Sequence, residues 1–215
     1  MPLSAARIHI SPPQRLTTGA LLILHAHGLL LALPVLLAAL IVSLQNIDIS
    51  SFVFPVLAMG MTLWFLPLGL GNPYVSWLVR AHKAAVPTEP AAFIVQIKLR
   101  PRLQSGLRAW LEDADDIGVL SFTESKLLFE GDAIRLSVPF EEIQQVCRHS
   151  SGWRGLFVYG APVALEISGL AQVRHLEIAE RTSWLLPTSR KIAAALYAQF
   201  LQAKATSASA QGNHS

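Results

Sequence analysis

The second half of the chain alternates apolar and polar residues, a pattern that is typical of β-strands. Phe93, Val95, Ile97 and Leu99 alternate with mostly polar residues, which gives one apolar face. Further short strand-like runs follow, separated by turn residues, at 119–123, 126–130, 134–138, 143–147, 156–159, 163–167 and 173–179. The pattern predicts about seven or eight short strands, as in a small barrel or sandwich.

The last periodic element predicts a helix over residues 187–202. Pro187 suits a first helical turn, and Ile192, Leu196 and Phe200 recur every four residues. We expect this helix to cover one open end of the β domain, which spans residues 91–205. The polar residues 206–215 predict a disordered tail.

The first eighty residues differ in character from the β domain. There are 32 residues without a formal charge between Arg15 and Asp48, and another 31 between Asp48 and Arg80. A bilayer core needs about 20 apolar helical residues. The sequence therefore predicts two transmembrane helices, at about 19–44 and 52–79, that form an antiparallel hairpin.

The cations predict the orientation of this hairpin. Residues 1–18 carry Arg7 and Arg15, the linker 80–90 carries Arg80 and Lys83, and the connection between the spans carries no cation. We expect a multi-pass protein of the inner or plasma membrane with both termini in the cytoplasm. A cleaved signal peptide is the competing interpretation of the first span, although its apolar region is longer than usual and no clear cleavage site follows.

Composition and motifs narrow the function further. The chain is 52% hydrophobic and only 14% charged, with a single Cys, which excludes a disulfide framework. It contains no nucleotide-binding, nucleophile-elbow or zinc-protease motif. We expect no enzyme activity, no catalytic residue, no metal site and no cofactor. The domain past Trp110 is net acidic, which disfavours nucleic acid as a partner.

The segment 118–146, GVLSFTESKLLFEGDAIRLSVPFEEIQQV, carries a resemblance to a known family. It resembles the core of bacterial PH-like and GRAM-type domains, including the step Pro139-Phe140-Glu141-Glu142-Ile143. The resemblance implies a PH-like β-barrel of about seven strands with a C-terminal capping helix. It also implies binding of lipids, peptides or proteins rather than a chemistry. The expected fold class is thus α+β, a two-helix transmembrane hairpin followed by this barrel.

The strongest candidate site is basic. Six cations and one anion lie between Arg80 and Arg108. Lys98, Arg100 and Arg102 follow one another at the end of the first strand, as in PH domains that hold phosphate headgroups, and Arg80 and Lys83 lie nearer the membrane. These residues are predicted either to bind anionic lipid headgroups or only to set the topology.

Other candidates have weaker support. Trp153 and Arg154 form a possible partner-binding loop. His25 and His27 point about 200° apart on a helix, so they cannot easily share a metal, and the sequence leaves their role open. Cys147 is predicted to be buried in a strand, whereas the acidic pairs 115–116 and 141–142 are predicted to be solvated loop charges.

These observations give two functional hypotheses. The first is a non-enzymatic scaffold or adaptor that presents a PH-like domain at the membrane and binds a partner protein or anionic lipid headgroups. The alternative is a regulatory or accessory subunit of a membrane transporter or membrane-enzyme complex. Expected partners are membrane lipid and either another protein or further copies of this chain.

Overall fold

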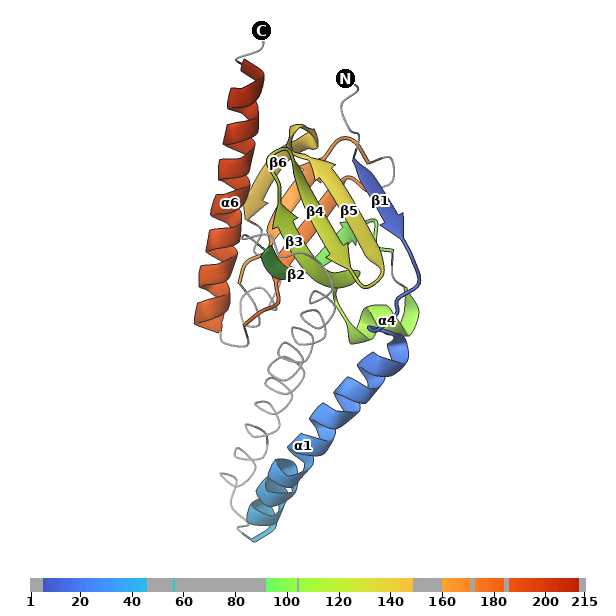
Figure 1. The fold of residues 1–215 in the computed structure, drawn as a ribbon. Helices are drawn as coiled ribbons and strands as arrows, with labels where there is room; N and C mark the ends of the chain where they lie inside the picture. Colours follow the sequence, from blue (N-terminus) through green and yellow to red (C-terminus); the bar gives the residue numbers. More distant parts are fainter. Residues whose placement is uncertain are drawn as a thin grey trace.

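The computed structural model describes residues 6–45, 56, 92–103, 105–148, 160–170, 173–183 and 186–212. Its centre is one curled antiparallel sheet with the strand order β1-β5-β4-β3-β2-β8-β7-β6 (Figure 1). The strands are β1 (Arg7–Ile10), β2 (Ala92–Arg100), β3 (Asp116–Phe122), β4 (Lys126–Gly131), β5 (Ile134–Pro139), β6 (Ile143–Arg148), β7 (Val163–Ile167) and β8 (His175–Glu180). A short 3-10 turn, η2 (Phe140–Glu142), joins β5 to β6.

The alternation in the sequence sets which side chains fill the barrel. Val95, Ile97 and Leu99 of β2 are fully buried, as the apolar face of that strand predicted. Ile134, Leu136 and Val138 of β5 point into the same core. Since side chains alternate between the two faces of a strand, the polar residues between them lie on the other face. Gln96 of β2 is also buried there and accepts a hydrogen bond from Arg181.

Helix α6 (Leu186–Gly212) closes the barrel, and it packs against β6, η2, β7 and β8. Leu196 and Phe200 are buried, and the Phe200 ring meets Phe122 edge-on at 4.9 Å between centroids. The helix is longer than predicted, because residues 206–212 are helical rather than disordered. Three hydroxyl groups donate to backbone carbonyls one turn back, so these polar side chains find hydrogen-bond partners within the helix.

The prediction of about seven or eight short strands followed by a C-terminal helix is confirmed. Strands β2 to β8 follow one another around an antiparallel barrel, and the C-terminal helix covers its side. The strand predicted at 156–159 lies outside the described residues. The short helix α4 (Gly106–Leu111) occupies the stretch between β2 and β3.

The prediction of a transmembrane hairpin, and with it the expected fold class and multi-pass localisation, is wrong. Among the helices that the structure describes, none combines the length and the apolar character needed to cross a bilayer. Helix α1 (Thr18–Gln45) covers the first predicted span, but its first turns pack on α4 and Leu21 is buried there. The second predicted span, 52–79, lies outside the described residues except for Val56.

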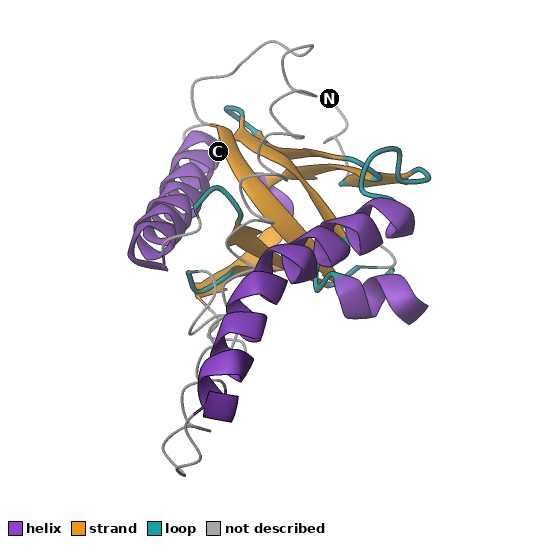
Figure 2. Cartoon of the chain, turned by 90° about the horizontal axis from the view of Figure 1, so that it is seen from below, coloured by secondary structure: helices purple, strands orange, loops and turns teal. Residues whose placement is uncertain are grey.

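The N-terminal segment attaches α1 to the barrel. Strand β1 pairs with β5, and the Asp132 carboxylate in the β4–β5 turn accepts hydrogen bonds from the backbone N–H groups of Arg15 and Leu16 at 2.9–3.0 Å. Helix α1 then starts with Thr17 Oγ1 accepting from the Ala20 amide. Seen from below, α1 crosses the end of the barrel, away from α6 (Figure 2).

Candidate functional site

The predicted basic run is present on β2, but each of its cations faces an acidic partner. Lys98 Nζ lies 3.1 Å from Asp113 Oδ1, and Arg102 lies 3.8 Å from the same carboxylate oxygen. Arg100 pairs with Glu177 at 2.5 Å. Two carboxylates thus offset most of the charge of the three cations, which lowers the local potential available to an anion.

The remaining predicted site residues lie outside the described part of the chain. These are Arg80 and Lys83 of the expected linker, and Trp153 and Arg154 of the expected binding loop. His25 is described, and its Nδ1 lies 2.7 Å from the Leu21 carbonyl oxygen one turn back. His25 therefore has a local partner on its own helix.

The acidic stretch 112–116 is structural, which corrects the prediction that Asp115 and Asp116 are solvated. Both are buried. The Asp115 carboxylate accepts from the backbone amides of Leu99 and Leu103, and Glu112 pairs with Arg181 at 3.0 Å. Buried carboxylates need such donors, so this stretch joins the end of β2 to the start of β3.

Asp116 has an unusual environment. Its carboxylate accepts hydrogen bonds from the backbone amides of Ala133, Ile134 and Ile117 at 2.7–2.9 Å. Burial nevertheless raises the pKa of Asp116 from 3.8 to about 6, and the nearby charge of Asp132 adds to the increase. The three amide donors oppose this shift but do not cancel it.

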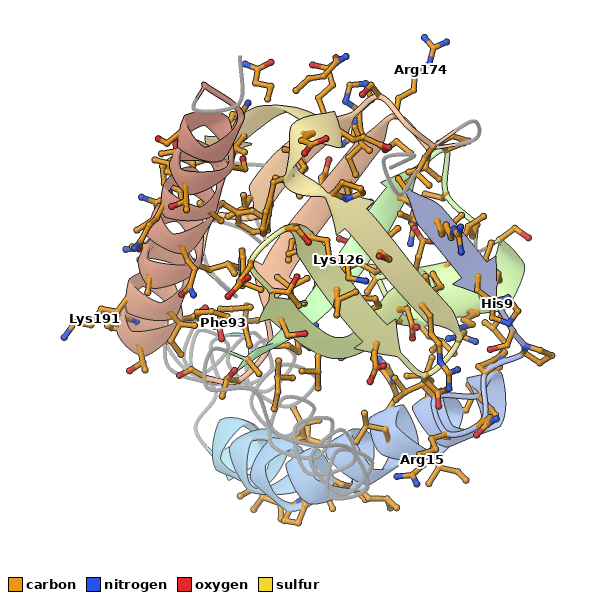
Figure 3. The ribbon with its side chains drawn as sticks, turned by 45° about the horizontal axis from the view of Figure 1, so that its top comes forward. His9, Arg15, Phe93, Lys126, Arg174 and Lys191 are labelled. Atoms are coloured by element: carbon orange, nitrogen blue, oxygen red, sulfur yellow. The ribbon has the colours of Figure 1, made fainter. Side chains whose placement is uncertain are left out.

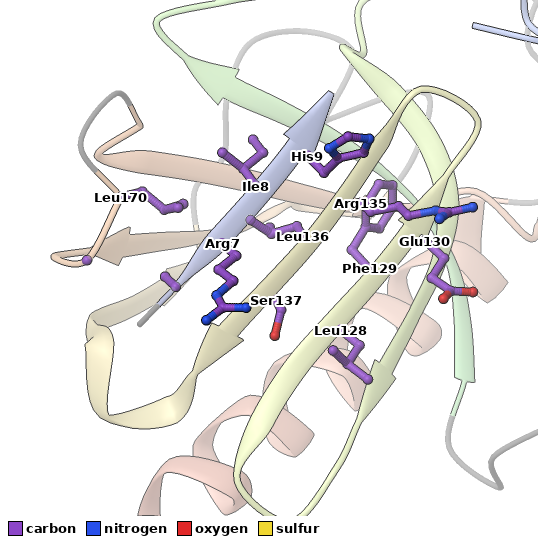
Figure 4. A pocket seen from close by; sticks show the side chains of 12 residues that line it. Arg7, Ile8, His9, Leu128, Phe129, Glu130, Arg135, Leu136, Ser137 and Leu170 are labelled. Carbon is purple, nitrogen blue, oxygen red and sulfur yellow. The ribbon is translucent and has the colours of Figure 1, made fainter. Parts of the chain in front are cut away.

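A groove of about 780 Å³ lies over β1, β5 and β4 (Figure 4). The pairing of the strands places its side chains in two rows on the outer surface. One row runs Arg7, Ser137, Leu128, and the next runs His9, Arg135, Glu130. Residues directly opposite each other in an antiparallel pair have Cβ atoms about 5 Å apart, so each row is a set of neighbours.

The groove carries basic side chains that are not neutralised. Arg7 and Arg135 are exposed, and neither forms an ion pair with any residue that the structure describes. Glu130, opposite Arg135, lies beyond ion-pair distance. His9 projects at the sheet edge, on the opposite side of the barrel from Lys191 of α6 (Figure 3). The groove thus combines two guanidinium groups that have no acidic partner among the described residues with an apolar contact from Leu128.

Strand β1 also ends the sheet. It pairs with β5 on one side, and no described strand pairs with its other side. An unpaired strand edge presents backbone donors and acceptors to which another extended segment can add. The edge and the groove lie next to each other, since Arg7, Ile8 and His9 belong to both.

A smaller hollow of about 270 Å³ lies over β6, β7 and β8. Cys147 lines it and is exposed, which corrects the prediction that this thiol is buried. Arg100, His175 and Glu177 are also in its wall. Within the described ranges, no group of three or more His, Cys, Asp or Glu side chains is arranged to hold a metal ion.

The groove was not found from the sequence. Arg7 and His9 lie in residues 1–18, whose cations predict membrane orientation, and Arg135 lies within the strand-like run 134–138. The alternation RIHI at 7–10 was the available signal for a strand. Four residues are too few to indicate which strand they pair with.

Comparison with protein-family models and with curated proteins gives no match. Among solved structures, the chain is similar to one that concerns the PH and C1 domains of the Vav1 exchange factor. That similarity has 13% identity and a TM-score of 0.33, and it covers 82% of this chain and 45% of that chain. The chain therefore spans less than half of that neighbour.

Proposed function

We propose that this chain is a non-enzymatic binding module. It recruits a partner protein by binding an extended acidic segment of that partner. The segment adds along the free edge of β1 and places its carboxylates over the groove. The observation that carries the proposal is the pair Arg7 and Arg135, both exposed and both without an acidic partner among the described residues. A guanidinium binds a carboxylate through two parallel hydrogen bonds, which gives orientation as well as energy.

The two parts of this surface have different tasks. Backbone hydrogen bonds to β1 supply affinity for any extended segment, whereas side-chain contacts select its sequence. Alternate residues of the added strand face the groove, where they meet Arg7 and Arg135 together with Leu128. The preferred segment therefore has acidic residues at every second position, and the residues between them face away from the groove.

Binding of anionic lipid headgroups by Lys98, Arg100 and Arg102, with Arg80 and Lys83, stays a prediction. A headgroup at these β2 residues has to compete with Asp113 and Glu177 for the same cations. The groove offers cations without that competition. This difference favours a protein segment at the groove over a lipid at the β2 end.

The test uses the full chain and a fluorescent 12-residue peptide that alternates valine and glutamate. We expect a rise in fluorescence anisotropy on binding, and at least a tenfold loss of affinity, about 1.4 kcal/mol, in the double variant Arg7→Glu and Arg135→Glu. Lys191→Glu on the exposed surface of α6 is the matched charge reversal and leaves the affinity unchanged. A peptide of valine and lysine is the control for nonspecific strand addition.

Two results would contradict the proposal. One is equal affinity for the acidic and basic peptides. The other is binding to vesicles that contain phosphatidylserine, lost in the variants Lys98→Glu and Arg102→Glu, while the acidic peptide does not bind. The second result would assign the function to the β2 end and to lipid.

A further inference from the structure

Helix α1 exposes more large apolar side chains than any other described element. Ile23, Leu30, Leu37 and Leu44 are between 49% and 72% exposed, and Leu33 and Leu40 are about half exposed. Single apolar residues scattered over a protein surface are normal, whereas a contiguous group of this size is not. Past its first turns the helix extends away from the barrel (Figure 1).

Six of the eight exposed large apolar residues of α1, all except Leu22 and Ile41, follow a seven-residue repeat. Their spacing alternates between three and four residues, which is the spacing of the buried seam in a coiled coil. The seam consists of Ile23, Ala26, Leu30, Leu33, Leu37, Leu40 and Leu44, and every member is exposed. It covers three heptads, or about 32 Å of helix.

We propose that this seam is a self-association interface, in which α1 pairs with α1 of a second copy of the chain. Identical seams are complementary to each other in a two-fold pair, because each leucine enters the spaces between leucines of the other helix. The exposed parts of the six large members amount to roughly 600 Å² of apolar surface per copy, so a pair buries at most about 1,200 Å². That is the lower limit of a stable, specific interface.

Charge does not oppose this pairing. Helix α1 contains no Asp, Glu, Lys or Arg from Thr18 to Gln45. Two copies therefore bring no like charges together along the seam. The absence of charged flanking positions also means that packing of the seam itself provides the specificity.

The base of α1 is fixed, so the seam is presented in a defined position. Asp132 binds the backbone amides of Arg15 and Leu16, and Leu21 is buried beside α4. Pro34 lies next to the seam and lacks a backbone donor, but the helix continues through it to Gln45. The seam is therefore continuous over its three heptads.

The experiment co-expresses two full-length copies with different affinity tags and measures how much of one copy is recovered with the other. We expect recovery from the parent chain and at least a tenfold loss in the double variant Leu33→Gln and Leu37→Gln. Ala38→Gln changes an exposed position of α1 off the seam, and Leu201→Gln makes the same substitution on exposed α6. Both controls keep the recovery of the parent.

Circular dichroism of each variant checks that the chain is folded, and since the seam residues are exposed in the single copy, we expect an unchanged helical signal. Two outcomes would overturn the proposal. Either no copy is recovered with the other in the parent, or the seam variants leave recovery unchanged. A parent that is a single copy, with a lower thermal midpoint in the seam variants, would instead assign the seam to another segment of the same chain.

Discussion

Asp116 shows how a single buried carboxylate makes stability depend on pH. Its pKa is raised from 3.8 to about 6 in the folded chain, chiefly by burial. The folded state therefore holds the proton more tightly, and this contribution is fully present below pH 3.8 and is lost as pH rises through 6. The free energy of unfolding should fall by up to about 3 kcal/mol over that window.

The measurement is urea unfolding at pH 4.5 and pH 7.5. Asp116→Asn removes the titrating group, so the difference between the two pH values should shrink in this variant. Glu124→Gln, at an exposed turn position, keeps the difference of the parent. An unchanged pH dependence in Asp116→Asn would show that the titration belongs to another group.

Gly118 provides a second test at the level of one residue. A Cβ atom at this position would lie 2.2 Å from the backbone oxygen of Glu130 on the neighbouring strand. Backbone cannot move aside without breaking the β3–β4 pairing, so Gly118→Ala should lower stability by about 2 kcal/mol or more. Gly19→Ala, in the first turn of α1 with its nearest neighbour 4.0 Å away, should instead raise stability slightly. Thermal unfolding of the two variants measures both effects, and an unchanged midpoint in Gly118→Ala would contradict the first expectation.

Among the elements, helix α1 is attached to the barrel where the N-terminal segment meets the β4–β5 turn. Asp132→Ala removes the acceptor for the Arg15 and Leu16 amides at the base of α1. We expect a loss of about 1–2 kcal/mol and faster hydrogen exchange in residues 12–20. Glu141→Ala, at an exposed position of η2, is the control. If exchange at 12–20 stays the same, the Asp132 contacts do not hold this helix in place.

The elements also show which features the sequence could predict. Alternation over 93–99 and 134–138 placed the core side chains of β2 and β5 correctly, because period-two burial is a local property. The long uncharged stretch predicted a membrane span at α1, and this prediction was wrong. A count of uncharged residues does not show that Leu16 and Leu21 are buried against other parts of the protein.

The candidate site was harder to predict for a related reason. Lys98 and Arg102 are close in sequence, but their partner Asp113 reaches them only through the folded connection between β2 and β3. Arg7 and Arg135 are 128 positions apart, and the pairing of β1 with β5 brings them to one surface. Neither relation leaves a local pattern in the chain.

At the scale of the whole molecule, the two proposed surfaces have a joint consequence. A pair of chains joined through α1 carries two grooves, so a surface coated densely with acidic peptide should bind it more tightly than a free peptide does. The variants Leu33→Gln and Leu37→Gln should weaken binding to the coated surface by tenfold or more and leave affinity for free peptide unchanged. Surface plasmon resonance at high and low peptide density measures this difference. Equal losses at both densities would mean that the seam contributes to the groove itself.

The groove over β1, β5 and β4 is proposed to bind acidic protein segments. Hydrogen exchange of the full chain, with and without the valine–glutamate peptide, locates the contact. We expect slower exchange in residues 6–11 and 133–139, where Arg7 and Arg135 lie. Protection confined to residues 96–103, around Lys98 and Arg102, would contradict it.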